Sequence, residues 1–250
     1  MPRLGSIAIF CLILALAAAA CIALAGLGYR WHWWGLGTAF GMLPVGALVG
    51  AAAAVLALIV GCIGAWRRRL GVLLASAIAV PLAGGALAVP LNMKMTADRV
   101  PPIHDITTDS ENPPAFVALK SARDQAANGS AYGGAAVAEK QKAGYPDIAP
   151  IVLAVPPDQA LARAEAAARA MGWSIAAAVP GEGRLEASAT TPWWGFVDDI
   201  VVRVQPASGG SRVDIRSASR VGVSDLGVNA ARIRRFAHTL AAIASAGATK

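Results

Sequence analysis

The first 91 residues of this 250-residue chain contain no acidic residue and no lysine. Their only formal charges are five arginines, whereas all 15 acidic side chains and the other 17 basic ones lie in residues 92–250. The whole chain is 56% hydrophobic and 15% charged, against roughly 25% charged residues in an ordinary soluble domain. This scarcity of charge excludes a disordered chain and a single water-soluble globule, and it divides the chain into an apolar and a polar part.

Cysteine is absent from the polar part, because Cys11, Cys21 and Cys62 all lie within the first 91 residues. The polar part therefore has neither a disulfide framework nor a cysteine-based zinc site. No block of lysine or arginine dominates it, so the net charge of +7 does not indicate nucleic-acid binding. It also lacks the signatures of serine hydrolases, phosphate-binding loops and zinc proteases. We expect no cofactor and no bound metal.

Three runs without a charged residue occupy residues 4–27, 39–66 and 70–91. The shortest would extend roughly 33 Å as a helix, and the hydrocarbon core of a bilayer is about 30 Å thick. Helices are the expected form, because backbone groups in lipid must pair within their own segment. Residues 1–91 are therefore predicted to form a three-helix transmembrane region, with the lipid bilayer as its partner.

The arginines predict the orientation of these helices. Arg3 precedes the first run, three consecutive arginines at 67–69 form the turn between the second and third runs, and the opposite turn has only Arg30. Because basic residues accumulate on the cytoplasmic side, we expect the N-terminus and the 67–69 turn to be cytoplasmic. Three crossings then place residues 92–250 outside the cytoplasm.

The first apolar run has an alternative interpretation as a cleaved signal peptide. Arg3 supplies a charged start and residues 17–20 are all alanine, as such a segment requires. We favour an uncleaved helix because the apolar run continues past Cys21. Cleavage would leave two spans and would still place the polar part outside.

The polar part contains an irregular segment and a regular one. Residues 92–150 are rich in proline and turn residues, with a short helix expected near 135–143. Residues 151–250 have the pattern of a helix from Pro157, four strands at 173–179, 184–191, 196–205 and 211–220, and a last helix capped by Asp225 or Asn229. This order predicts an α+β domain, in which helices cover one face of a four-stranded antiparallel sheet and the irregular segment wraps around the domain.

Alternation along the strands sorts their side chains onto two faces. The face under the helices should carry the apolar residues Leu185, Ala187, Ile200, Val202, Val204, Val213 and Ile215. The opposite face should carry Arg184, Glu186, Asp199, Arg203, Arg212, Asp214 and Arg216, with Arg220 at the end of the row. We call its five arginines the arginine row. It is either a solvated face with cross-strand ion pairs or a surface for a protein partner or an anionic ligand, which the planar fork of arginine suits.

Further candidates lie outside the row. His104 with Asp105 or Asp109 could serve as acid/base groups, although their spacing fits neither a calcium loop nor a zinc site. Asp198 should point to the apolar side, where it needs a partner such as Arg232, Arg234, Arg235 or a backbone amide. Trp193 and Trp194 are candidates for core packing, a ligand wall or a contact with the bilayer surface.

Five sequence blocks carry a resemblance to a known family. They are Ile-His-Asp-Ile-Thr-Thr-Asp at 103–109, Asn-Pro-Pro at 112–114, Tyr-Pro-Asp-Ile at 145–148, Trp-Trp-Gly-Phe-Val-Asp-Asp at 193–199 and Asp-Ile-Arg-Ser-Ala-Ser-Arg-Val-Gly at 214–222. Over residues 101–245 the chain resembles the bacterial domain-of-unknown-function family 1499. The resemblance implies an exported or membrane-anchored setting and supplies no reaction, cofactor or catalytic residue. In a bacterium, the predicted topology corresponds to an inner-membrane protein with a periplasmic C-terminal domain.

Three functions remain open from the sequence. The first is a non-catalytic binding or interaction module of the cell envelope, with the arginine row or the apolar patch Trp193–Phe196 as its contact surface. The second is an envelope enzyme, such as a hydrolase, that uses His104 with Asp105 or Asp109. The third is an accessory subunit of a larger membrane complex.

Overall fold

The computed structural model describes residues 3–248, with side chains as far as residue 244. The chain forms two compact units. The first comprises Met1–Thr96 together with the short segment Pro192–Gly195, and the second comprises Ala97–Thr191 and the residues from Phe196 onward.

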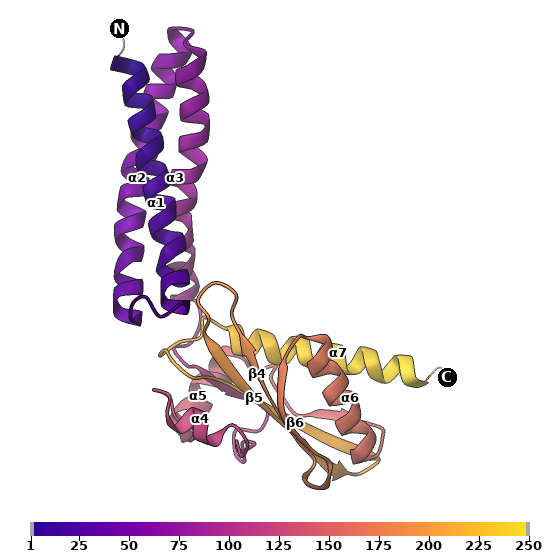
Figure 1. Ribbon diagram of the computed structural model, residues 1–250. Helices are drawn as coiled ribbons and strands as arrows, with labels where there is room; N and C mark the ends of the chain where they lie inside the picture. Colours follow the sequence, from indigo (N-terminus) through magenta and orange to yellow (C-terminus); the bar gives the residue numbers. More distant parts are fainter. Residues whose placement is uncertain (1–2, 249–250) are drawn as a thin grey trace. The chain divides into compact units, whose positions relative to one another are not determined.

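Three long helices make up the first unit (Figure 1): α1 (Arg3–Arg30), α2 (Leu36–Trp66) and α3 (Leu70–Ala97). Each is long and apolar enough to cross a membrane. The three predicted helices are therefore confirmed, and each extends a few residues beyond its uncharged run.

Glycines in α2 let the other two helices approach closely. A Cβ atom added to Gly46 would lie 2.7 Å from Ile22 of α1, and one added to Gly50 would lie 2.9 Å from the carbonyl oxygen of Ala83 in α3. Gly64 is equally tight against Val72. Small residues permit such backbone approach in lipid, so these glycines serve packing within the chain.

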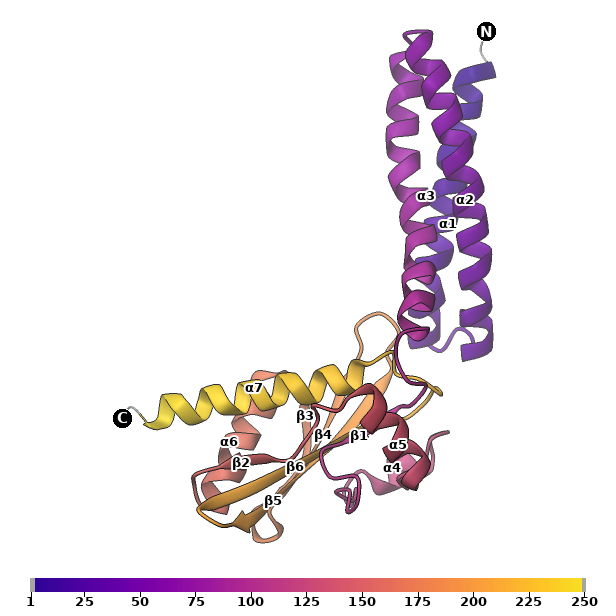
Figure 2. The same ribbon diagram turned by 180° about the vertical axis from the view of Figure 1, so that it is seen from behind.

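The second unit contains a six-stranded antiparallel sheet, not the four strands expected. Its strands are β1 (Asp105–Thr107), β2 (Ile151–Leu153), β3 (Ser174–Val179), β4 (Arg184–Thr190), β5 (Val197–Ala207) and β6 (Gly210–Ser219). The order is β1-β6-β5-β4-β3, and β2 also pairs with β6 (Figure 2). The four strands expected from alternation are present. The two additional strands have three residues each, which is too short for a period-two pattern to reveal.

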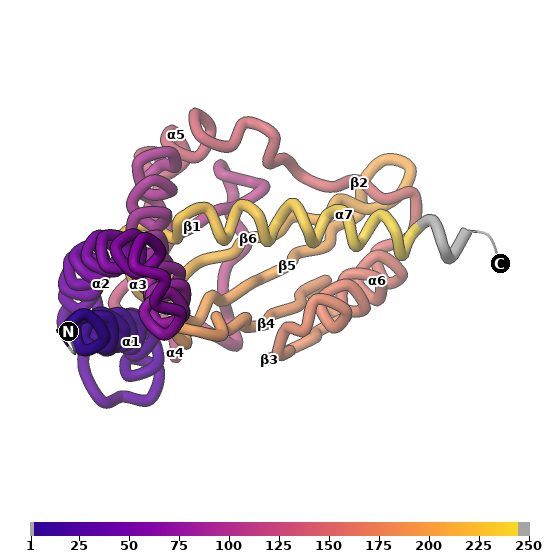
Figure 3. The backbone as a smooth tube through the Cα atoms, turned by 90° about the horizontal axis from the view of Figure 1, so that it is seen from above, coloured from indigo at the N-terminus to yellow at the C-terminus, as the bar shows by residue number. Residues whose placement is uncertain are grey.

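Helices and the apolar face of the sheet enclose the main core. The unit also contains α4 (Lys120–Asp124), α5 (Gly134–Gly144), α6 (Pro157–Ala170), a 3₁₀ turn (Pro180–Glu182) and α7 (Val228–Ala248). Helices α6 and α7 lie side by side over one face of the sheet (Figure 3). Trp173 stacks on Phe236 of α7 at 5.4 Å between ring centroids. The predicted inward residues Leu185, Ala187, Ile200, Val202, Val204, Val213 and Ile215 are all buried in this core.

Candidate functional site

The arginine row lies on the second face of the sheet, as predicted, but this face is covered. Residues 108–132, which we call the covering segment, run across it, and Phe116 and Leu119 pack there on Val201 and Ala218. The side chain of Arg216 is only 3% exposed, and the most exposed member, Arg212, reaches 39%. The expectation of a solvated face is therefore wrong, because the segment expected to be irregular lies on it, but the expected cross-strand ion pairs are present, as between Arg203 and Asp214.

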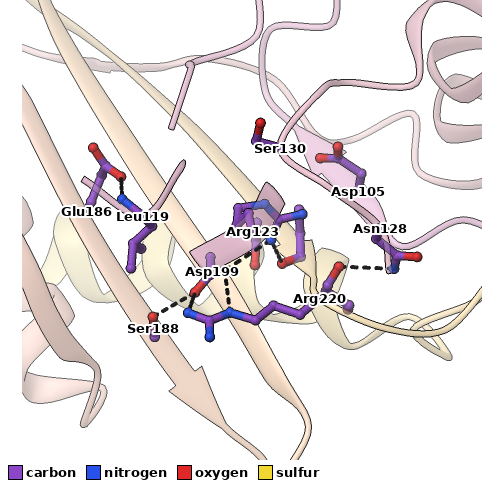
Figure 4. Close-up of polar contacts among 12 residues, drawn as sticks. Asp105, Leu119, Arg123, Asn128, Ser130, Glu186, Ser188, Asp199 and Arg220 are labelled. Carbon is purple, nitrogen blue, oxygen red and sulfur yellow. Dashed lines mark hydrogen bonds and ion pairs between the residues drawn. The ribbon is translucent and has the colours of Figure 1, made fainter. Parts of the chain in front are cut away.

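A fully buried carboxylate, Asp199, joins three elements on this face (Figure 4). It accepts hydrogen bonds from Ser188 Oγ at 2.7 Å and from Arg220 Nε and Nη2 at 2.8 and 2.9 Å. Arg123 of α4, which is 1% exposed, donates from Nη1 to Asp199 at 3.2 Å and to the carbonyl oxygen of Ala218 at 2.8 Å. Asp199 thus ties the covering segment to β4, β5 and β6.

A second buried carboxylate, Glu186 of β4, holds the backbone of the covering segment. It accepts three consecutive backbone N–H groups, from Val117 at 3.0 Å and from Ala118 and Leu119 at 2.9 Å. Figure 4 shows the bond from Leu119. Arg184 also donates to it. A carboxylate that accepts several N–H bonds is well satisfied without further partners. Glu186 is therefore an attachment point for the segment.

The remaining members of the row also form ion pairs. Arg203 Nη2 lies 3.0 Å from both Asp109 and Asp214, and Arg212 lies 2.8 Å from Asp109 and 3.0 Å from Asp214. The side-chain hydrogen bond with Asp214 is the main cause that raises the pKa of Arg212. Asp109 is thus part of a structural network.

Arg216 and Asp105 form a bidentate ion pair at the other end of the covered face. Arg216 Nε and Nη2 donate to the two carboxylate oxygens of Asp105 at 2.9 and 2.7 Å. Arg216 also donates to the carbonyl oxygens of Pro114 and Ser130, and its guanidinium lies 4.9 Å from the ring centroid of Phe116. Both residues are buried, so the pair is closed to solvent.

His104 does not meet the two aspartates that were grouped with it. Its Nδ1 lies 3.4 Å from the carbonyl oxygen of Val223, and its own carbonyl oxygen accepts from Ser219 N and Asn229 Nδ2. Within residues 3–248, no three His, Cys, Asp or Glu side chains are placed to hold a metal ion. The groups of the enzyme hypothesis therefore have separate structural partners.

Asp198 points to the helix side of the sheet, where its predicted need for a partner is confirmed. Arg232 Nη2 of α7 donates to it at 2.5 Å. Nearby, Asp225 accepts the N–H groups of Gly227 and Asn229 at 2.9 and 2.7 Å, and so caps the start of α7. Burial is the main cause that raises the pKa of Asp225, and the charge of Asp198 adds to it.

Trp193 and Trp194 belong to the first unit. Trp194 is 6% exposed and stacks on Phe40 at 5.1 Å. Trp193 Nε1 donates to the carbonyl oxygen of Ala23 at 3.0 Å. Of the three candidate roles, core packing is what Trp194 performs here.

Sequence reasoning missed Arg123 and the role of the covering segment. Arg123 lies in a five-residue helix with no readable periodicity. The nearest signal was the arginine row itself, because a face with so many charges needs counter-charges from some other part of the chain.

Fold and charges together define a class: a membrane protein in which three spanning helices precede an α+β domain with a buried ionic layer. The family model described as a protein of unknown function (DUF1499) matches residues 105–240. The chain belongs to this family, as the resemblance of its sequence blocks indicated. No curated protein matches the sequence.

Proposed function

We propose that the chain is a bacterial inner-membrane protein with three crossings, a cytoplasmic N-terminus and its family domain in the periplasm. The arginines support this orientation, because Arg3 and residues 67–69 outnumber the single Arg30 of the opposite turn. The absence of cysteine from residues 92–250 is compatible with an oxidising compartment.

We further propose that the domain acts as a non-catalytic binding or interaction module. One observation carries this choice: Asp105 and Asp109, the carboxylates available for chemistry beside His104, are both held by arginines in structural ion pairs. A general acid or base must reach its substrate, and Asp105 is only 4% exposed. The two most accessible members of the arginine row, Arg212 near the start of β6 and Arg220 just after its end, are the proposed contacts for a protein partner or an anionic ligand.

Alkaline phosphatase fused after Lys250 tests the compartment, because this enzyme is active only outside the cytoplasm. We expect an active fusion at Lys250 and an inactive one in the 67–69 turn. The opposite result would reverse the orientation.

Purification in mild detergent, with identification of bound proteins and lipids, tests the module. We expect the co-purifying component to be reduced by Arg212→Gln. Arg169→Gln is the matched control, since Arg169 forms an exposed ion pair with Glu165 within α6. An equal effect of the two variants would exclude the arginine row as the contact, and an activity abolished by His104→Gln would favour an enzyme.

A further inference from the structure

Three arginines in the second unit bind a carboxylate through one particular edge, formed by Nε and Nη2. Arg216 uses this edge for Asp105, Arg220 for Asp199, and Arg234 for Asp147, with distances between 2.6 and 2.9 Å. The edge presents two parallel N–H groups at the spacing of two carboxylate oxygens.

The most buried of these arginines leaves the same edge unused. Both hydrogen bonds of Arg123 come from Nη1. Its Nε is buried without an acceptor, and no hydrogen bond from its Nη2 occurs among the described residues. Buried donors are nearly always satisfied, so Nε of this residue, which is 1% exposed, requires an acceptor that the described part of the chain does not supply.

The charges around Arg123 indicate the sign of that acceptor. Three guanidiniums, those of Arg123, Arg216 and Arg220, face two carboxylates. Asp105 is taken by Arg216 and Asp199 is taken by Arg220, each in a bidentate pair. Arg123 therefore has only a 3.2 Å contact with an already paired carboxylate. Burial lowers the pKa of Arg123, as expected for a charge that is incompletely compensated.

The surroundings suit a small planar ligand. The ring of Phe116 lies 4.6 Å from the guanidinium carbon of Arg123 and covers one of its flat sides. Tyr132 of the covering segment, whose ring lies 5.5 Å from the guanidinium carbon of Arg216, is a second buried donor without a partner. Burial and the nearby Asp105 raise the pKa of Tyr132 to about 12, so its hydroxyl keeps its proton at neutral pH.

We propose that the Nε and Nη2 groups of Arg123 bind a small planar monoanion of the carboxylate class between the sheet and the covering segment. The burial of Arg123 favours a free anion as small as formate or acetate, because a carboxylate on a large partner would have to displace the segment. The proposal does not depend on which side of the membrane the domain occupies.

Thermal unfolding of the full-length protein in detergent tests the site, with Trp173 as a fluorophore in the core of the domain. Sodium formate and sodium acetate are the probes, titrated against sodium chloride at constant ionic strength. A ligand that binds only the folded state raises the unfolding temperature in a saturable way. We expect this rise with formate or acetate and not with chloride.

Arg123→Lys keeps the positive charge but removes the fork. We expect it to need at least tenfold more formate for the same half-maximal rise. Arg234→Lys is the matched control, because Arg234 uses its fork for an exposed pair with Asp147, and it should titrate like the wild type. An equal response to chloride, or an unchanged midpoint in Arg123→Lys, would overturn the proposal.

If Arg123→Lys does not fold, the proposal is tested instead by a crystal structure of the wild-type protein, from crystals grown with formate. We expect density for a planar anion with its two oxygens in hydrogen-bond contact with Nε and Nη2. A water molecule alone at this edge would contradict the proposal.

Discussion

At the scale of single residues, the ionic layer depends on Asp199. Its replacement by asparagine keeps the shape but leaves Arg123 and Arg220 without their shared counter-charge. Removal of one partner from a buried ion pair typically costs about 3–5 kcal/mol. We expect Asp199→Asn to lower the free energy of unfolding of the domain by an amount of this order, measured by denaturant titration. Asp147→Asn, which breaks the exposed pair with Arg234, should change it by about 1 kcal/mol or less. Similar losses in the two variants would argue against a tightly coupled buried network.

Asp225 gives a prediction with a defined sign. Its pKa is raised in the folded state, chiefly by burial, so the folded state holds this proton more tightly than the unfolded state does, where the pKa is about 3.9. Stability should therefore fall as the pH rises from about 4 through the folded pKa, and then level off. Asp225→Asn cannot ionise and keeps one acceptor oxygen, so it can satisfy only one of the N–H groups of Gly227 and Asn229. We expect the stability of this variant, relative to the wild type, to increase with pH over that window.

Asp147→Asn should show the opposite trend. Hydrogen bonds from Arg234 are the main cause that lowers the pKa of Asp147. The contribution of Asp147 to stability is therefore present above the unfolded pKa and is lost as the pH falls.

For Asp225, parallel stability curves of the Asp225→Asn variant and the wild type would show that the Asp225 carboxyl has the same pKa in the folded and unfolded states.

At the scale of elements, the covering segment should be the part of the domain most sensitive to a local change. Glu186→Gln replaces a charged acceptor of three backbone N–H groups by a neutral amide with one acceptor oxygen. We expect faster amide hydrogen exchange at residues 117–119, read by mass spectrometry, and unchanged exchange in β5. Glu182→Gln removes an exposed partner of Arg184 and serves as the control. Exchange that stays slow at 117–119 would show that packing of Phe116 and Leu119 suffices to hold the segment.

Elements also differ in how far the sequence could reveal them. Alternation in β4, β5 and β6 correctly sorted Leu185, Ile200 and Val202 from Arg203 and Asp214, because a strand has a period of two. It could not reveal what covers each face. The pairing of β1 with β6 and the position of Arg123 depend on contacts between residues far apart in the chain, and a three-residue strand or a five-residue helix carries no periodic signal. The partner of Asp198 was predictable only as a set of alternatives, of which Arg232 is the one in contact.

At the scale of the whole molecule, hydrophobicity and charge determine the organisation. Three uncharged runs sufficed to predict three spanning helices, because length and apolar character are what the bilayer requires. The exact ends were less predictable: α3 continues to Ala97, since a helix does not stop where lipid ends. The family match over residues 105–240 agrees with the polar part as a domain. The prediction of which side of the membrane this domain occupies rests on the arginine distribution.

Site-directed labelling measures that side most directly. In a variant with Cys11, Cys21 and Cys62 replaced by alanine, a new cysteine is placed at Val152, a 68%-exposed position in the domain, or at Arg68 in the triple-arginine turn. Intact cells, made permeable only in the outer membrane, are then treated with a membrane-impermeant maleimide. We predict that Val152→Cys is labelled and that Arg68→Cys is labelled only after the cells are lysed. Labelling of Arg68→Cys in intact cells, with Val152→Cys protected, would contradict a periplasmic domain.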